Sequence, residues 1–193
     1  IDSAREVITH APLVPAWERR FREEARAKII HHGTHLEGND LNLNEVEEIL
    51  SPDTPSSSTA PVGRDRDIQE VINYRSVMEY LDSLVTKEGY VTLNRHILEE
   101  IHRLTVKGLL PDGESGHYRS VKVVIRNTST KEITFRPPSP TEVPFFIEEL
   151  FTWLSSEDGK SVHPLLRAGI LHYELVRIHP FTDGNGRTAR AMA

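Results

Sequence analysis

Residues 179–190 read His-Pro-Phe-Thr-Asp-Gly-Asn-Gly-Arg-Thr-Ala-Arg, and this stretch decides both the fold and the chemistry. A proline pushes the residue before it out of the helical region, so we expect a preceding helix to end at His179, before Pro180. The glycines on either side of Asn185 allow the backbone to approach a ligand closely. The residues from Arg187 onward predict a new helix, and a loop of free N–H groups that opens a helix can bind an anion.

Four side chains of this stretch supply the other parts of a phosphate site. Arg187 and Arg190 are three residues apart, so they share a helix face and can clamp one polyphosphate. Asp183 is a hard oxygen ligand, and Mg²⁺ is commonly held by one or two carboxylates together with substrate phosphates. Histidine titrates near neutrality, so His179 is suited to take a proton from a hydroxyl nucleophile. A plain helix connector is the alternative, but it would not need a base, a metal ligand and a clamp together.

The stretch resembles the signature of the Fic (Fido) family, H-P-F-x-[DE]-G-N-G-R-x-x-R, at every defined position. Members of this family mostly transfer AMP from ATP to a hydroxyl side chain of a protein and release pyrophosphate. The resemblance therefore implies a protein adenylyltransferase with His179 as general base, Asp183 as the Mg²⁺ ligand and Phe181 as an anchor in the core. It also implies a nucleotide site made of Asp183, Gly184, Asn185, Gly186, Arg187, Thr188, Ala189 and Arg190.

Residues 33–39, Gly-Thr-His-Leu-Glu-Gly-Asn, resemble the inhibitory motif of the same family, [ST]-x-x-x-E-[GN]. Gly33 departs from the motif, whereas Glu37 and Gly38 match it. The resemblance implies that Glu37 pairs with Arg190 and prevents productive seating of the γ-phosphate, since two anions compete for one guanidinium. The alternative is an ordinary helix end, with Gly38 just after it and Glu37 in solvent. If the inhibitory interpretation is right, Glu37→Gly raises AMP transfer.

A β-hairpin is predicted by alternating apolar residues over 121–125 and 133–135, on either side of a turn at 127–131. It resembles the family's flap, which pairs with the backbone of a protein target and presents the target hydroxyl to the motif histidine. The alternative is a hairpin that only covers the bundle. By position, the resemblance places four flap residues beside the nucleotide: Ile125, Arg126, Asn127 and Thr128.

The rest of the pattern is mainly helical, and we expect an all-α, Fic-type bundle with a small β-hairpin flap. Apolar spacing predicts helices that include residues 13–30, 44–50, 68–81, 93–104, 142–154 and 166–178. The buried face of the last helix is predicted to carry Leu166, Ile170, Tyr173 and Ile178.

Three segments are expected along the chain: an N-terminal helical segment with the inhibitory motif, a Ser/Thr/Pro-rich linker and a Fic core, at residues 1–50, 51–63 and 64–193. The resemblance to the family covers about residues 92–193. The chain opens on Ile1, and the family's helix continues past the position of Ala193, so we expect a fragment with a truncated C-terminus.

Composition narrows the class of protein further. The net charge of −6 argues against a nucleic-acid partner. The absence of cysteine excludes a disulfide scaffold and favours a reducing compartment, cytoplasmic or nuclear. No apolar run reaches the length of a membrane span. His31, His32 and His35 are interpreted as a helix surface rather than a zinc site, because the sequence shows no further cluster of ligands.

The expected partners are ATP, with Mg²⁺, and a protein target docked on the flap, while an oligomer stays possible. Three alternatives to AMP transfer remain open at this stage. A de-AMPylase would use Glu37 to orient water against the phosphodiester. A transferase could use another donor, since nothing in the motif reads the base. A non-catalytic ATP-sensing module would bind ATP without transfer, although it would have no need of His179.

Overall fold

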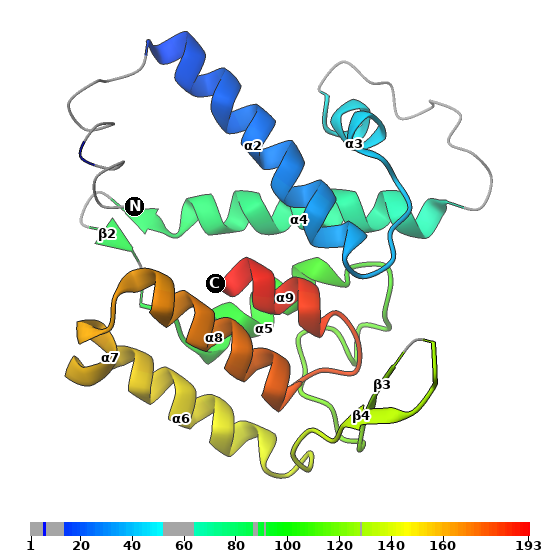
Figure 1. Cartoon of the computed structure of the whole chain (residues 1–193), viewed down its shortest axis with the longest axis vertical. Helices are drawn as coiled ribbons and strands as arrows, with labels where there is room; N and C mark the ends of the chain where they lie inside the picture. The colour runs from blue at the N-terminus through cyan, green and yellow to red at the C-terminus, as the bar shows by residue number, and fades with distance from the viewer. Residues whose placement is uncertain (1–5, 7–13, 52–63, 87–88, 91, 128) are drawn as a thin grey trace.

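The computed structural model describes residues 6, 14–51, 64–86, 89–90, 92–127 and 129–193. Its longer helices, in chain order, are α2 (Pro15–His35), α3 (Leu43–Leu50), α4 (Asp65–Ser83), α5 (Arg95–Thr105), α6 (Val143–Ser155), α8 (Pro164–Ile178) and α9 (Asn185–Met192) (Figure 1). A short α7 (Glu157–Ser161) joins α6 to α8. The expected all-α bundle is confirmed. The predicted linker, apart from Ser51, lies outside the described residues.

Two short antiparallel strand pairs accompany the helices. β1 (Val85–Thr86) pairs with β2 (Gly89–Tyr90), a hairpin that the sequence analysis did not predict. β3 (Ile125–Arg126) pairs with β4 (Ile133–Phe135) at the position of the predicted flap. No helix in the described part of the chain combines the length and the apolarity that a bilayer crossing demands.

Local sequence explains where several helices begin. Asn42 and Glu45 form a complete capping box at the start of α3, in which each side chain accepts a hydrogen bond from the backbone N–H of the other. The side chain of Asn94 caps α5 by accepting a hydrogen bond from the N–H of Ile97. Pro164 occupies the first turn of α8, where a missing N–H costs nothing.

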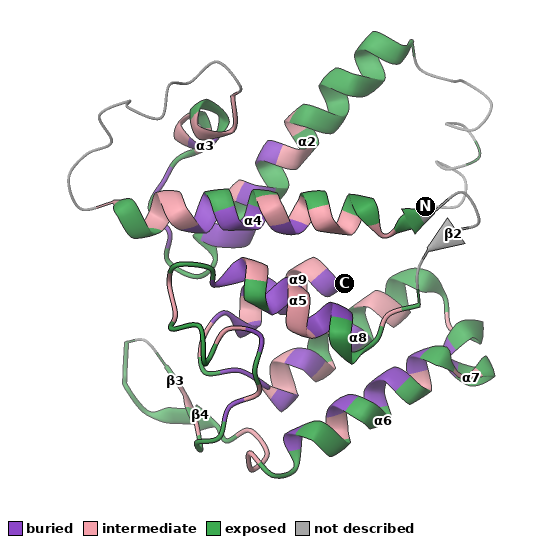
Figure 2. Cartoon of the chain, turned by 180° about the vertical axis from the view of Figure 1, so that it is seen from behind, coloured by how far each residue is buried: buried purple, intermediate pink, exposed green. Residues whose placement is uncertain are grey.

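Two hydrophobic clusters hold the bundle together. The larger one joins α5, α6, α8 and α9 to the second half of α4 through Val77, and it contains Phe181 as expected. The smaller one packs α2 and α3 on the first half of α4, through Val71 and Tyr74. Figure 2 shows buried residues along α5, α9 and the facing side of α4, while the N-terminal part of α2 is exposed. Helix α4 therefore contributes to both clusters and carries α2 close to α9.

The sequence analysis predicted four buried residues on α8, and the prediction is wrong for three of them. Leu166 and Tyr173 are 65% and 63% exposed, and Ile170 is also exposed. The buried residues are Leu171, Leu175 and Ile178, which follow each other at the same helical spacing on another face. Helix α8 is apolar on more than one side, so spacing alone could not choose between them. Packing on α6 and α9 selects the second face.

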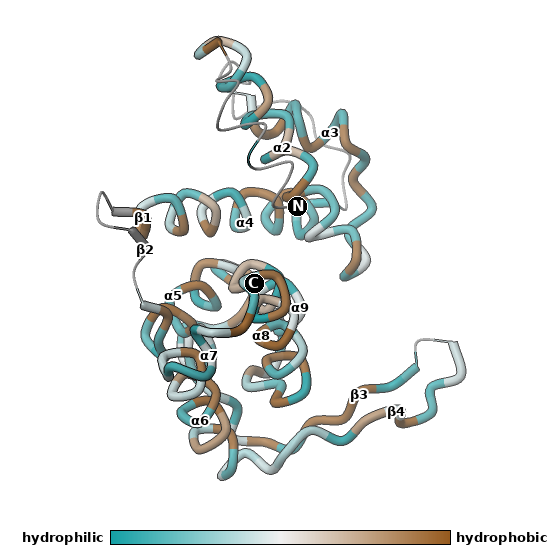
Figure 3. The backbone as a smooth tube through the Cα atoms, turned by 60° about the vertical axis from the view of Figure 1, so that its left-hand side comes forward, coloured by the Kyte–Doolittle hydropathy of each residue, from teal (hydrophilic) through white to brown (hydrophobic). Residues whose placement is uncertain are grey.

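The β3–β4 hairpin projects from the helices (Figure 3). The first strand is shorter than the predicted alternation over 121–125, since only Ile125 and Arg126 pair with β4. A register irregularity between these two residues ends the regular pairing. In addition, the carbonyl of Val121 accepts a hydrogen bond from the guanidinium of Arg119 instead of a neighbouring strand. The hairpin is thus attached at its base, and its paired residues are exposed except for Ile125, which is half-buried.

Candidate functional site

His179 stands at the junction of α8 and the motif loop, in the left-handed conformation with φ 52°. Its Nδ1 lies 3.3 Å from the carbonyl oxygen of Val176. A carbonyl only accepts, so Nδ1 carries the proton and Nε2 remains the basic nitrogen. Burial lowers the pKa of His179 below its ordinary value, and this outweighs the hydrogen bond to Val176. The imidazole is therefore neutral near pH 7, as a general base requires.

The backbone around His179 is fixed by Arg119, a buried side chain that the sequence analysis did not single out as a site residue. Its Nε donates to the carbonyl oxygen of His179 at 2.7 Å, and its backbone N–H donates to that of Pro180 at 2.9 Å. The same guanidinium donates to the carbonyls of Val121 and Pro138, at the two ends of the flap. One side chain thus joins the base of the flap to the first residue of the motif.

Asp183 lies at the turn before α9, and its side chain is 45% exposed. Oδ1 accepts a hydrogen bond from the N–H of Gly184 at 2.7 Å, and Oδ2 accepts one from Arg66 at 3.1 Å. Partial burial opposes ionisation, but the Gly184 hydrogen bond and the guanidinium groups of Arg187 and Arg66 outweigh it and lower the pKa of Asp183. The group is therefore a carboxylate at neutral pH.

A buried histidine of α5, His102, supports the backbone of Asp183. Its Nδ1 accepts a hydrogen bond from the N–H of Gly116, so its Nε2 donates to the carbonyl oxygen of Asp183 at 3.0 Å. The ring stacks on Phe181 with 3.6 Å between centroids. Burial lowers the pKa of His102 to about 4, so the ring is neutral. The sequence offered one signal for the supporting role of His102, namely that it is a single histidine on the apolar face of the helix predicted over residues 93–104.

The loop itself is held by Asn185, whose side chain accepts from the N–H and donates to the carbonyl of Phe181, both at 2.9 Å. Asn185 was predicted to surround phosphates, but its amide is engaged in closing the loop. Gly184 has φ 75°, and a Cβ atom there would lie 2.7 Å from Val106. Thr188 and Ala189 are buried, and Ala189 belongs to the larger core cluster.

Arg187 is the buried cation of the site, with a side chain only 3% exposed. Its Nη1 lies 2.6 Å from Oε1 of Glu70 on α4, whose side chain is 7% exposed. Nevertheless, within the described residues neither Nε nor Nη1 makes a hydrogen bond, so this contact is an ion pair without hydrogen-bond alignment. A buried donor without an acceptor costs about 1–3 kcal/mol. Arg187 therefore has unused capacity for an anionic ligand.

Arg190 forms the ion pair that the inhibitory motif implies. Its Nη2 lies 2.7 Å from Oε1 of Glu37 and also donates to the carbonyl of Gly33 at 2.8 Å. The Glu37 carboxylate also covers Gly186, because a Cβ atom built on Gly186 would overlap Oε1. An anionic group thus already lies at the mouth of α9. Glu37 is partly exposed, but its carboxylate is held by Arg190 rather than left free in solvent.

Three of the four predicted flap residues can be located relative to this cluster. Ile125, Arg126 and Asn127 lie on the hairpin, and Thr128 is outside the described residues. The side chains of Arg126 and Asn127 make their hydrogen bonds within the hairpin, to the backbone of residues 129–131. The described hydrogen bonds do not connect these three residues to the motif, so their nucleotide contacts stay a prediction.

Comparisons with known proteins point to one family. The model of the Fic/DOC family matches residues 92–193. The chain is 31% identical over its whole length to a protein adenylyltransferase Fic of Culex quinquefasciatus and 32% identical to one of Nematostella vectensis. It covers 36% and 42% of those proteins, so it spans well under half of the curated relatives it matches.

Solved structures show the same fold. Fic-1 (residues 134–508) of C. elegans superposes with a TM-score of 0.79 at 32% identity, over 99% of this chain and 52% of that one. A Fic domain containing signaling protein of Bacteroides thetaiotaomicron gives a TM-score of 0.78 at 28% identity, over 94% and 66% of the two chains.

Proposed function

Since this chain belongs to the Fic/DOC family, we propose that it transfers AMP from ATP to a hydroxyl side chain of a protein target. The name protein adenylyltransferase, which its relatives carry, supports this activity. The observation that carries the proposal is the state of Arg187, a buried cation whose Nε has no hydrogen-bond partner within the described residues and whose Nη1 only forms an ion pair with Glu70. A phosphate oxygen would satisfy these donors.

The triphosphate would lie across the N-terminal end of α9. Free N–H groups of the first turn and the helix dipole favour an anion there. Arg187 and Arg190 would bind the outer phosphates, and Gly184 and Gly186 would allow the backbone to approach the inner ones. The amide of Asn185 would contribute by holding the loop rather than by direct contact.

The chemical step would use His179 as the base. The oxygen of the target hydroxyl attacks the α-phosphorus, its proton passes to Nε2 of His179, and the bond from the α-phosphorus to the bridging oxygen breaks. Pyrophosphate leaves, and the target keeps the AMP as a phosphodiester. The hydrogen bond from Nδ1 to Val176 orients the ring, and a positioned base contributes typically 10²–10⁴-fold.

The residues fit a magnesium ion that is shared with the nucleotide. Asp183 is an ionised, half-exposed carboxylate at the mouth of α9. Within the described residues, no three His, Asp or Glu side chains are grouped in a way that would form an all-protein metal site. Mg²⁺ commonly binds through one carboxylate and substrate phosphates, and it would neutralise phosphate charge when bound. Asp183 would hold it.

Glu37 would make the enzyme autoinhibited. Its carboxylate takes the Arg190 guanidinium and covers Gly186, the two groups that the triphosphate would need. The flap hairpin would dock the target, because its strands, apart from the half-buried Ile125, are exposed and offer backbone groups for strand addition.

Intact-mass measurement of the Glu37→Gly protein with ATP and Mg²⁺ tests the proposal. A mass gain equal to AMP, on itself or on an added protein, is expected, with a smaller gain in the wild type. Glu37→Gln is the isosteric comparison, and Glu37→Gly combined with His179→Ala is the inactive control. A gain equal to phosphate, or none in Glu37→Gly, would refute AMP transfer.

One observation favours de-AMPylation as a second activity of the same site. The Glu37 carboxylate lies beside Gly186 and Arg190, where it could orient a water molecule against an AMP phosphodiester. Release of AMP from a modified target by the wild type, but not by Glu37→Gly, would establish this reaction.

A further inference from the structure

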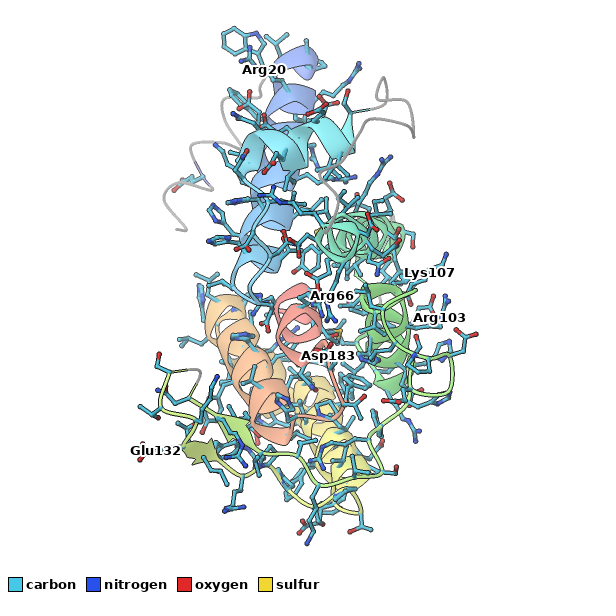
Figure 4. All side chains as sticks on the ribbon, turned by 90° about the vertical axis from the view of Figure 1, so that its right-hand side faces the viewer. Arg20, Arg66, Arg103, Lys107, Glu132 and Asp183 are labelled. Atoms are coloured by element: carbon cyan, nitrogen blue, oxygen red, sulfur yellow. The ribbon has the colours of Figure 1, made fainter. Side chains whose placement is uncertain are left out.

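Arg66 of α4 reaches the motif from outside the residues that match the family model. Its Nη2 donates to Oδ2 of Asp183 at 3.1 Å, and its Nε donates to Oε1 of Glu70 at 3.3 Å. Figure 4 shows Arg66 and Asp183 next to each other, between α4 and α9. The side chain therefore spans two carboxylates, one of which is the proposed ligand of the metal.

Together with Arg187, these groups form a closed ring of alternating charge. Arg66 pairs with Asp183, Asp183 lies 3.8 Å from Arg187, Arg187 lies 2.6 Å from Glu70, and Glu70 returns to Arg66. Two carboxylates and two guanidinium groups have no net charge. Arg66 is 60% exposed, against 3% for Arg187 and 7% for Glu70, so it is the member that can leave most easily.

Both oxygens of Asp183 already have hydrogen-bond donors, one outside the ring and one in it. Oδ1 accepts the N–H of Gly184, and Oδ2 accepts Arg66. A divalent cation that binds Oδ2 of Asp183 would come close to the guanidinium of Arg66, and the two positive groups would repel each other. Arg66 thus places a protein cation on the carboxylate that would hold the metal.

We propose that Arg66 competes with the divalent cation for Asp183, and so sets the metal concentration at which the site accepts ATP. This inference rests on the proposed function. The cation would gain from its contact with phosphate what it loses by displacing Arg66, so it would load with the nucleotide rather than alone. A purely structural Arg66, joining α4 to α9, is the competing explanation, and it predicts a change in stability without a change in metal dependence.

The test measures ATP binding by calorimetry at a series of free Mg²⁺ concentrations, in the Glu37→Gly background. Arg66→Ala removes the competing cation. It should lower the Mg²⁺ concentration at which ATP affinity reaches half of its maximum by about two- to five-fold, because exposed ion pairs contribute energies in that range. Arg66→Lys keeps a cation near Asp183 and should stay closer to the parent. Arg75→Ala is the matched control, since Arg75 lies on α4 and pairs with Glu79 at 2.9 Å, away from the ring. It should leave the Mg²⁺ midpoint unchanged.

The outcomes separate the two proposals. An unchanged or higher midpoint in Arg66→Ala, with thermal unfolding showing a folded protein, overturns the competition. Loss of ATP binding in Arg66→Ala alone also overturns it, because Arg66 would then be required for binding. If Arg66→Ala does not fold, Arg66→Gln replaces it with the same expectation. Absence of ATP binding in the parent and in Arg75→Ala refutes the proposed function, and the inference falls with it.

Discussion

Replacing Glu70 with glutamine tests how firmly α4 holds the motif. Glu70 is 7% exposed and lies 2.6 Å from the buried guanidinium of Arg187, while its other oxygen accepts a hydrogen bond from Asn39 at 3.1 Å. Glu70→Gln keeps the shape and removes the charge, so Arg187 becomes a buried cation without its nearest counter-ion. Removing one partner of a buried pair costs about 3–5 kcal/mol. In a chain of 193 residues this lowers the melting temperature by about 6–20 °C.

The double-mutant cycle with Arg187→Met makes the prediction specific. The single change Arg187→Met should cost less, about 1–3 kcal/mol, because Glu70 keeps Arg66 and Asn39 as partners. The double variant contains neither charge, so it should be less destabilised than the sum of the two single variants. Urea unfolding gives each free energy. Glu79→Gln is the control, because its ion pair with Arg75 is about half exposed and contributes about 1 kcal/mol or less. Additive losses, or a loss for Glu70→Gln no larger than the control, would refute the buried pair.

Three further predictions concern the motif. In the Glu37→Gly background, His179→Ala should reduce AMP transfer roughly 10²–10⁴-fold while calorimetry still detects ATP binding; loss of both would assign His179 to binding instead. The pKa of His179 is lowered by burial, so kcat/KM of Glu37→Gly should fall to half of its plateau only below pH 6.5, the ordinary midpoint of histidine; a midpoint above 6.5 would contradict this. Gly184→Ala should destabilise the fold by about 1–3 kcal/mol in thermal melts, because φ is 75° and its Cβ would meet Val106, whereas Gly113→Ala, with open space around it, should be close to neutral.

Much of this site was predictable because its parts are contiguous in the chain. A proline after His179, glycines around Asn185 and two arginines three residues apart define a loop, a helix start and a clamp through local rules alone. The pairing of Glu37 with Arg190 joins distant segments, and only the resemblance to a family motif indicated it. The prediction of the buried face of α8 failed because the apolar residues of this helix fit two faces equally well. Only the packing of the neighbouring helices decides between the two faces.

The supporting residues could not be found in the same way, because their partners are far apart in sequence. Glu70 is a charged residue on a helix, where spacing assigns charges to solvent, yet it is buried against Arg187 across the contact between α4 and α9. Arg119 and His102 act on backbone carbonyls far away in the sequence, so even the position of His102 on an apolar helix face did not identify its partner. The motif therefore specifies which chemical groups are present, while helices α4 and α5 determine their charge balance and position. Changes at Arg66 or Glu70 of α4 that leave the twelve motif residues intact should consequently alter how the site binds metal and nucleotide.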